Sequence, residues 1–134
     1  MHVAARVEHA LSAAMALPEP SDRPIAGSVL AEELGISYPY LMTIIGPLKK
    51  AVLARVRRGP RGGLSLARPA AEITLAEVTW AVDDPFELTE RVTADLDTGP
   101  AGAGVLAPLW DSAHQAVFTV FAEVPLAEVR SSAQ

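Results

Sequence analysis

The chain has 134 residues and a formal net charge of −5, and half of its residues are hydrophobic. This length suits one domain, or one small domain with a dimerisation extension. The absence of cysteine excludes disulfides, thiolate catalysis and cysteine-bound metals. No signal peptide is evident, and no uncharged run approaches the roughly 18 residues of a membrane span, so we expect a cytoplasmic protein.

The charge is distributed unevenly along the chain. Residues 1–68 contain nine Lys and Arg against five Asp and Glu, a net charge of +4. Residues 69–134 contain two against eleven, a net charge of −9. Seven of the eleven basic residues lie between Lys49 and Arg68. Such asymmetry predicts a basic binding surface in the first half and an acidic remainder.

The first two predicted helices are separated by a proline-rich linker. Apolar residues recur at three-to-four spacing over residues 3–17 and predict a helix there. The prolines between Pro18 and Pro24 end it. A short second helix is predicted over residues 28–34, with Ser28 as its N-cap. Its inward-facing residues are predicted to be Val29, Leu30 and Leu34.

A third helix is predicted directly after a turn at Gly35. Ser37 is a good N-cap for it, and Pro39 lies in its first turn, where a missing N–H costs little. The helix is expected to extend to about Ala51, with Pro47 removing one backbone hydrogen bond and bending it. Two helices joined by a short turn that contains glycine form the signature of a helix-turn-helix.

A glycine-rich hairpin is predicted next. Its strands run from Val52 to Val56 and from Leu64 to Leu66, and Gly62 and Gly63 permit the positive φ angles of a tight turn. The nearest downstream acid is Glu72, so no neighbour in sequence can pair all the cations of the tip. A polyanion is therefore the expected partner of three arginines, which are Arg57, Arg58 and Arg61.

A fourth helix and a less regular segment are predicted after the hairpin. Thr74 is expected to cap the helix and Glu77 to complete a capping box. The segment 83–104 is predicted to hold a helix within Phe86 to Leu96, followed by a loop from Thr98 to Gly104. The apolar positions of the fourth helix are Leu75, Val78 and Val82.

A long helix with a broad apolar face is predicted near the C-terminus. So broad a face needs two surfaces to bury against, so we expect one from the same domain and one from a second subunit. Pro125 is expected to break the helix, and a polar tail is expected after it. The predicted dimerisation residues are Leu106, Leu109, Trp110, Ala113, Val117, Phe118, Val120 and Phe121.

Several short motifs follow one another in a specific order. They are Leu34-Gly35-Ile36-Ser37, Leu48-Lys49-Lys50-Ala51, Arg58-Gly59-Pro60, Leu66-Ala67-Arg68-Pro69, Glu72-Ile73-Thr74-Leu75-Ala76-Glu77-Val78 and Pro108-Leu109-Trp110. In this order they resemble the Rrf-two family of winged-helix transcription regulators over nearly the whole chain. The motif Pro108-Leu109-Trp110 would open the long helix.

The resemblance implies a mainly α fold with a small β-hairpin wing. A winged helix-turn-helix DNA-binding domain is expected over residues 1–68, and a linker, dimerisation helices and polar tail over residues 69–134. Many family members hold an iron–sulfur cluster through three cysteines before the long helix. Here Gly104 and Ala107 stand where many members have a Cys and a His. We therefore expect a homodimer without that cluster and without another cofactor.

The residues predicted to contact double-stranded DNA come from both ends of the third helix and from the hairpin. Ser37 is first of all a helix cap, and Tyr40 is equally open to packing in the core. Glu8 stands where a basic residue is frequent in the family, which disfavours an N-terminal phosphate contact, and Arg6 is the alternative residue for such a contact. The full set is Ser37, Tyr38, Pro39, Tyr40, Thr43, Lys49, Arg57, Arg58 and Arg61.

The predicted function is a homodimeric, sequence-specific DNA-binding regulator, with repression favoured, that binds a palindromic operator. The alternative is a winged-helix module for protein–protein interaction with weak or no DNA binding, which would not need the three hairpin arginines. A hydrolase is a remote third hypothesis, because the sequence has no recognisable nucleophile–base set, P-loop or dinucleotide motif.

The histidines and four aromatic residues could each serve either in packing or in binding a ligand. The three histidines, His2, His9 and His114, are isolated in sequence and favour packing over a metal site. Four aromatic residues favour core packing, with a pocket for a small-molecule effector as the alternative. They are Trp80, Trp110, Phe86 and Phe118.

Overall fold

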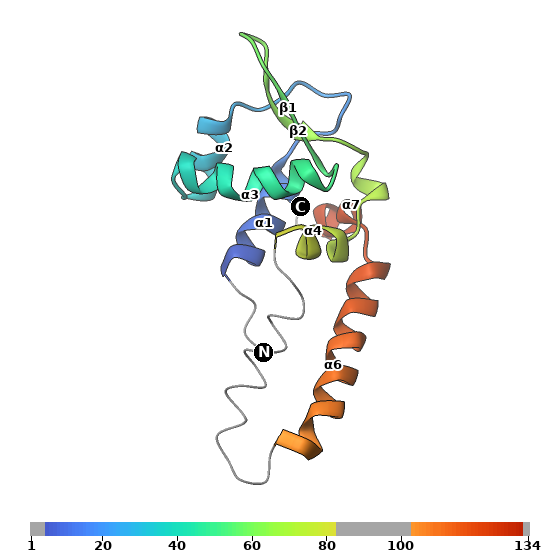
Figure 1. The fold of residues 1–134 in the computed structure, drawn as a ribbon. Helices are drawn as coiled ribbons and strands as arrows, with labels where there is room; N and C mark the ends of the chain where they lie inside the picture. Colours follow the sequence, from blue (N-terminus) through green and yellow to red (C-terminus); the bar gives the residue numbers. More distant parts are fainter. Residues whose placement is uncertain (1–4, 83–102, 133–134) are drawn as a thin grey trace.

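The computed structural model describes residues 5–82 and 103–132 of the chain. Within these residues, five α-helices and a hairpin form one body, and a sixth, long α-helix extends away from it (Figure 1). The fold is mainly α with one antiparallel two-stranded hairpin, which confirms the predicted class. No helix within the described segments is long and apolar enough to cross a membrane. The helix predicted within residues 86–96 lies outside the described residues.

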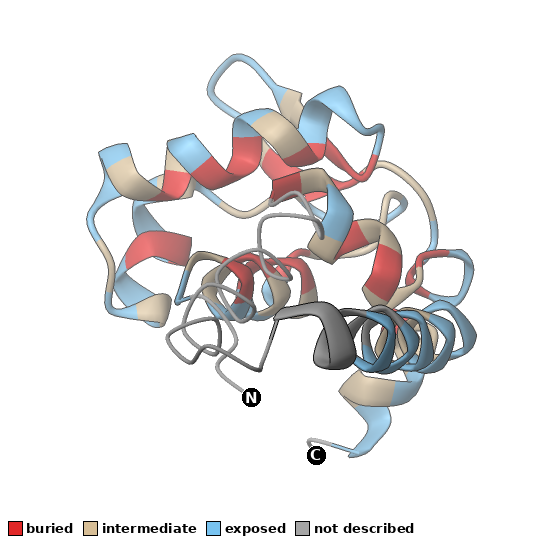
Figure 2. Cartoon of the chain, turned by 60° about the horizontal axis from the view of Figure 1, so that its bottom comes forward, coloured by how far each residue is buried: buried red, intermediate tan, exposed pale blue. Residues whose placement is uncertain are grey.

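A single hydrophobic core holds the elements of the body together (Figure 2). It draws residues from the first four helices, from both strands and from the helix nearest the C-terminus. Burying a Leu or Ile side chain contributes about 1.5–3 kcal/mol, so these residues dominate the stability of the body. The largest fully buried side chains are Leu17, Leu30, Leu41, Ile44, Ile45, Leu48, Leu66, Ile73 and Leu126.

The first two helices are α1, Ala5–Ala16, and α2, Gly27–Leu34. The predicted cap of α2 is wrong, because Ala26 occupies the N-cap position without a side-chain hydrogen bond and Ser28 lies inside the first turn. Val29 is exposed, which contradicts its predicted inward orientation. The adjacent residues Leu30 and Ala31 are buried instead, and a helix that turns both inward must turn the preceding residue outward.

The third helix, α3, spans Tyr38–Lys50 with Pro47 inside it. The helical pattern continues past the proline, since the Ala51 N–H donates to the Pro47 carbonyl over 3.0 Å. The turn between α2 and α3 contains Gly35 at a φ of 68°, the left-handed region that glycine tolerates best. The predicted helix-turn-helix is therefore present.

The hairpin consists of β1, Ala54–Arg57, and β2, Gly63–Leu66, with Ala54 opposite Leu66 and Arg57 opposite Gly63. Val52 and Leu53, predicted as strand, belong to the turn after α3. A third segment pairs with β2, because Ile25 and Leu64 exchange backbone hydrogen bonds of 2.9 and 2.7 Å. The proline-rich linker thus fastens the base of the hairpin to the body.

A short 3-10 helix, η1 at Ala70–Glu72, leads to α4 at Leu75–Val82. The predicted capping box is confirmed: the Thr74 N–H donates to Glu77 Oε2 over 2.9 Å, and the Glu77 N–H donates to Thr74 Oγ1 over 3.3 Å. Burial raises the pKa of Glu77, but the Thr74 N–H and the Arg68 guanidinium outweigh it and lower the pKa below its ordinary value. The carboxylate form is therefore favoured in the folded chain.

The C-terminal part differs most from the prediction. The long helix α6, Ala103–Glu123, begins within the predicted loop and contains Pro108 in its interior rather than at its start. Pro125 follows its end as predicted, but the next residues form a further helix, α7 at Leu126–Ser132, instead of a polar tail. Leu126 is fully buried, and its N–H donates to the Ile73 carbonyl over 2.7 Å.

Candidate nucleic-acid interface

The start of α3 presents exposed residues on a fixed helix end. The Ser37 hydroxyl oxygen accepts a 3.2 Å hydrogen bond from the Tyr40 N–H, which confirms Ser37 as the N-cap. Tyr38 is 51% exposed, and Pro39 beside it is exposed too. The Tyr38 ring lies over Gly27, where an added Cβ would come within 2.7 Å of the ring. The missing side chain of Gly27 therefore sets how closely α2 and the first turn of α3 approach.

Tyr40 turns toward α1 rather than outward. Its ring is half-buried, and its hydroxyl lies 3.0 Å from Nδ1 of His9. The two rings meet edge to face, with centroids 5.4 Å apart. The structure thus places Tyr40 and His9 in a packing contact between α1 and α3, which agrees with the structural interpretation of His9.

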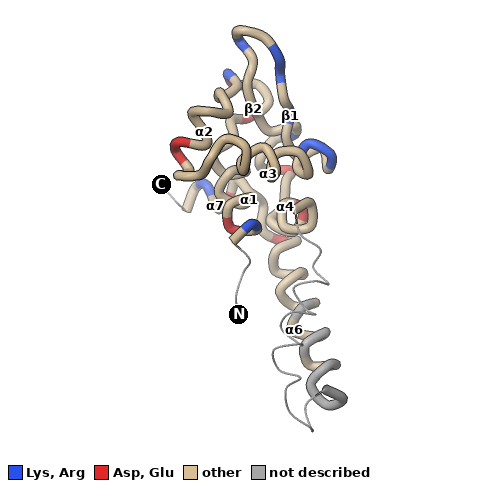
Figure 3. Tube along the Cα trace, turned by 60° about the vertical axis from the view of Figure 1, so that its left-hand side comes forward, with Lys and Arg blue, Asp and Glu red and all other residues tan. Residues whose placement is uncertain are grey.

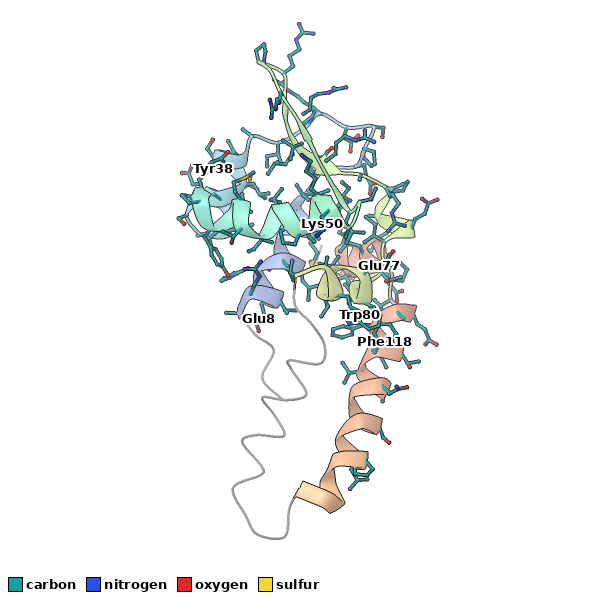
Figure 4. The ribbon with its side chains drawn as sticks, viewed as in Figure 1. Glu8, Tyr38, Lys50, Glu77, Trp80 and Phe118 are labelled. Carbon is teal, nitrogen blue, oxygen red and sulfur yellow. The ribbon has the colours of Figure 1, made fainter. Side chains whose placement is uncertain are left out.

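The other exposed residues of α3 are Thr43 and Gly46 in the middle and Lys49 and Lys50 at the end. Figure 4 shows Tyr38 and Lys50 at opposite ends of this helix. Both lysines lie in the last turn, where cations interact favourably with the helix dipole. The helix can therefore present an uncharged first turn to base edges and cations to flanking phosphates.

The hairpin arginines project beyond the body. Arg57, Arg58 and Arg61 are exposed, and within residues 5–82 and 103–132 none of them forms an ion pair. Figure 3 shows basic residues along the hairpin and at the end of α3, on the same side of the molecule. Three unpaired cations on a thin projection repel one another, so folding gives no reason to gather them there.

Glycines determine the shape of the hairpin tip, and the prediction is confirmed for Gly63 but wrong for Gly62. The positive φ angles belong to Gly59, at 103°, and Gly63, at 151°, and not to Gly62. Gly62 is needed for space, because a Cβ there would lie 2.1 Å from the Arg57 carbonyl oxygen. Gly63 serves both needs, since a Cβ on it would lie 2.5 Å from the Ile25 carbonyl oxygen.

One basic residue of this surface was missed by sequence reasoning. Arg55 is exposed on β1, two residues before Arg57, and alternate residues of a strand share a face. That spacing was the signal that could have identified it. Arg68, in contrast, is not available, because its guanidinium pairs with Glu77 at 2.7 Å and also donates to the Glu72 carbonyl.

Arg6 is placed differently from its expected phosphate contact. Its Nε donates to the Val82 carbonyl over 3.2 Å, and its Nη2 donates to the Thr43 carbonyl over 3.0 Å. The side chain is half-buried between α1, α3 and α4. The guanidinium is thus engaged by the protein's own backbone, and the prediction of a phosphate contact is not supported.

The long helix α6 carries large apolar residues that are exposed. Leu109 is 62% exposed and Val120 57% exposed. Among the other predicted dimerisation residues, Ala113 is exposed and three more are half-buried, whereas the side chains of Leu106 and Trp110 lie outside the described residues. The half-buried residues are Val117, Phe118 and Phe121.

The junction of α4 and α6 is aromatic. Trp80 and Phe118 lie with ring centroids 4.0 Å apart (Figure 4). Trp80 is still 49% exposed, so a flat aromatic surface remains uncovered next to α6. The contact between the Trp80 and Phe118 rings agrees with the prediction that these aromatic residues pack between helices.

The donor set does not fit a cysteine-ligated iron–sulfur cluster. Such clusters are held by cysteine thiolates, and the sequence contains no cysteine. Among residues 5–82 and 103–132, no group of three or more His, Asp or Glu residues is arranged to hold a metal ion.

Comparisons with known proteins give a family and relatives. The model of the Rrf2 (Rrf-two) family, described as an iron-dependent transcriptional regulator, matches residues 3–131. A Mycobacterium tuberculosis protein named as a candidate HTH-type transcriptional regulator is 31% identical over 136 positions, covering 99% of this chain and 83% of that relative. The HTH-type transcriptional regulator IscR of Cereibacter sphaeroides is 36% identical over 88 positions, covering 62% of this chain and 56% of the relative.

Solved structures show the same architecture. Staphylococcus aureus CymR in its oxidized form superposes with a TM-score of 0.76 and 25% identity, over 97% of this chain and 96% of that one. IscR of T. potens superposes with a TM-score of 0.79 and 23% identity, over 100% of this chain and 89% of that one. At 23% identity, the similarity to T. potens IscR shows a shared fold only.

Proposed function

This chain belongs to the Rrf2 family of transcriptional regulators, and we propose that it acts as a homodimer that binds a palindromic operator in double-stranded DNA and represses transcription. The observation that carries the proposal is the cluster of exposed guanidiniums at the hairpin tip, which have no ionic partner among the described residues and lie on the same side as the basic end of α3. A surface of this kind suits a duplex, because phosphates supply the missing counter-charges.

The recognition element in this proposal is α3. Its first turn, with Tyr38 and Pro39 exposed, enters the major groove, as the start of the second helix of a helix-turn-helix does. Thr43 lies one turn further along the same helix and is exposed to base edges or a thymine methyl group. Lys49 and Lys50 contact phosphates at the groove edge.

The hairpin serves as the wing. Arg57, Arg58 and Arg61 contact the adjacent minor groove or backbone, and Arg55 adds a fourth cation at the base of β1. The wing is anchored to the body through the pairing of Ile25 with Leu64, so its cations are held at a defined position relative to α3.

Dimerisation through α6 explains the uncovered apolar residues of that helix. Leu109 and Val120 are large, apolar and exposed in a single chain, and a second copy of α6 would cover them. A two-fold axis makes the operator palindromic, with half-sites about one helical turn or more apart. Occupation of such a site occludes a promoter, which makes repression the favoured outcome.

The signal that relieves repression differs from the usual one of the family. A chain without cysteine supplies no thiolate for a cluster, so we propose regulation that does not use an iron–sulfur centre. A small-molecule effector, a protein partner or the rate of synthesis would then set operator occupancy.

The test is selection of bound fragments from genomic DNA by the purified protein. We expect a palindromic consensus, and we expect the variant R58A/R61A to lose most of its affinity for it. The matched control R58K/R61K keeps both cations and should retain most of the affinity. Selection of no consensus, with equal binding by all three proteins, would favour the alternative of a protein–protein interaction module.

A further inference from the structure

We propose that Arg6 is a positioning residue for the recognition helix, and that it supplies the hydrogen bond that Pro47 withholds from the Thr43 carbonyl. This inference rests on the proposed role of α3 in DNA binding. The experiment below also tests the contact without DNA, so that the two proposals can fail separately.

The need for such a donor arises from helix geometry. In an α-helix the N–H of each residue donates to the carbonyl four residues earlier, so the partner of the Thr43 carbonyl is residue 47. Residue 47 is proline, which has no N–H. The helix nevertheless continues to Lys50, because the buried side chains of Ile44, Ile45 and Leu48 hold it against the core. The Thr43 carbonyl is left without its helical donor.

The Arg6 guanidinium occupies the position of that donor. Its Nη2 lies 3.0 Å from the Thr43 carbonyl oxygen, across 37 positions of sequence. A charged donor gives a stronger hydrogen bond to a carbonyl than a neutral N–H does. The contact thus replaces a local backbone bond with one from another helix, and it ties the middle of α3 to α1.

The same side chain also donates to a second carbonyl. Nε of Arg6 donates to the carbonyl of Val82, the last described residue of α4, over 3.2 Å. The planar guanidinium carries five N–H donors in a fixed fork, which suits two acceptors from different helices. Arg6 therefore joins α1, α3 and α4 at one point.

The position of Arg6 in its own helix supports a long-range role. It lies in the first turn of α1, where a cation is disfavoured by the helix dipole. Local helix energetics therefore give no reason for an arginine there. The two carbonyls on α3 and α4 account for it, because the guanidinium donates to both.

The consequence for DNA binding follows from where Thr43 lies. Thr43 is exposed on the face proposed to enter the groove, and its carbonyl accepts the hydrogen bond from Arg6. Releasing the carbonyl would let the middle of α3 shift relative to the wing. A shift of this kind weakens base and phosphate contacts without removing any residue that touches DNA.

A double-mutant cycle tests the proposal. The four proteins are the wild type, Arg6→Met, Pro47→Ala and the double variant, each titrated against the duplex that the wild type selects from genomic DNA. We expect R6M to bind about tenfold more weakly, since the bond involves a charged donor. We expect P47A to bind within about twofold of the wild type, because alanine at this position restores the backbone donor. The double variant should recover most of the loss.

The salt dependence of binding separates positioning from a direct phosphate contact. A lost phosphate contact lowers the slope of log K against log salt by about 0.9, whereas R6M should leave that slope unchanged. The variant R6K keeps the cation but cannot reach both carbonyls, so we expect it to fall between the wild type and R6M. Full retention of affinity in R6K, or a reduced slope in R6M, would overturn the proposal.

Thermal unfolding measures the same contact without DNA. R6M should lower the melting temperature by roughly 5 °C in the wild-type background and by clearly less in the P47A background. If R6M does not fold alone, the double variant should fold. Equal losses in both backgrounds, or a double variant that is as unfolded as R6M, would contradict the link to Pro47. If the four melting temperatures follow this pattern but the wild-type protein binds no duplex, the proposed function is wrong and the contact between Arg6 and the Thr43 carbonyl still stands.

Discussion

The arginines of the wing and those of the body show how one residue type serves two purposes. Arg57, Arg58 and Arg61 extend from the hairpin and have no ionic partner in the described part of the chain. Arg6 and Arg130 lie against backbone carbonyls of α1, α3 and α4. The difference lies in the surroundings, because the body arginines donate to backbone carbonyls, whereas within residues 5–82 and 103–132 the side chains of the tip arginines form no hydrogen bond or ion pair.

This contrast separates binding from stability. A guanidinium that is hydrogen-bonded by its own fold contributes to the free energy of unfolding and has few donors left for a phosphate. An exposed and unpaired guanidinium contributes little to folding and keeps its donors for a ligand. Substitutions in the two groups should therefore affect different measurements.

The largest expected effect comes from removing all three wing arginines. R57A/R58A/R61A should bind the selected duplex about 100-fold more weakly near 0.1 M salt and should lower the salt slope by about 2.7. Its melting temperature should stay within about 2 °C of the wild type. DNA titrations at four salt concentrations measure the affinity and the salt slope, and thermal unfolding measures the melting temperature. A large loss of stability would show that these side chains support the fold, and would contradict the proposed difference between wing and body arginines.

Arg130 is expected to show the opposite behaviour. Its guanidinium donates to the carbonyls of Met15, Ala14 and Leu17 at the end of α1 and pairs with Glu19 at 3.1 Å. R130M should lower the free energy of unfolding by about 2–3 kcal/mol, because several carbonyls lose a charged donor. Urea denaturation measures this change. A normal stability combined with a reduced salt slope would place Arg130 among the DNA contacts instead.

Glu77 gives a smaller effect with a pH signature. Its pKa is lowered in the folded chain from an ordinary value of 4.5. Its stabilising contribution is therefore fully present above that value and is lost as the pH falls through the lowered pKa. E77A should cost about 1 kcal/mol at pH 7, and E77Q less, because glutamine can still complete the capping box.

The pH dependence is the check on this pair of variants. The stability difference between the wild type and E77Q should shrink as the pH falls below 4.5, since the wild-type side chain then loses its charge too. Urea denaturation at several pH values measures it. A difference that stays constant down to about pH 3 would mean that the carboxylate charge, and with it the pairing to Arg68, contributes nothing.

Val52 allows a change in stability without any change in charge. It has a φ of 60°, which is costly for a β-branched residue, and its side chain is 62% exposed. V52N should raise the free energy of unfolding by about 0.5–1 kcal/mol, because asparagine tolerates this conformation. DNA affinity and salt slope should not change. A loss of stability would show that the Val52 side chain has a packing role.

The parts of the fold that the sequence predicts well are determined by neighbouring residues. The cap at Ser37, the capping box of Thr74 and Glu77, and the turn at Gly35 each involve residues within a few positions, so their patterns are visible in one stretch of sequence. The wing was visible for the same reason, because its glycines and arginines lie together.

The features that were missed depend on contacts between distant residues. Arg6 meets acceptors 37 and 76 positions away, and Arg130 meets the Met15 carbonyl at the end of α1, 115 positions away. No periodicity or motif marks such pairs. The residues after Pro125 look polar, so a single buried leucine, Leu126, gave too weak a pattern to predict α7. Arg55 is the exception, since the two-residue spacing to Arg57 was visible.

Sedimentation equilibrium of the protein with and without its selected duplex tests the central claim most directly. We expect a free species of twice the 14.1 kDa chain mass and a complex that contains two chains per palindromic duplex. A free species of 14.1 kDa that binds no duplex, even at low salt where electrostatic binding is strongest, would contradict it.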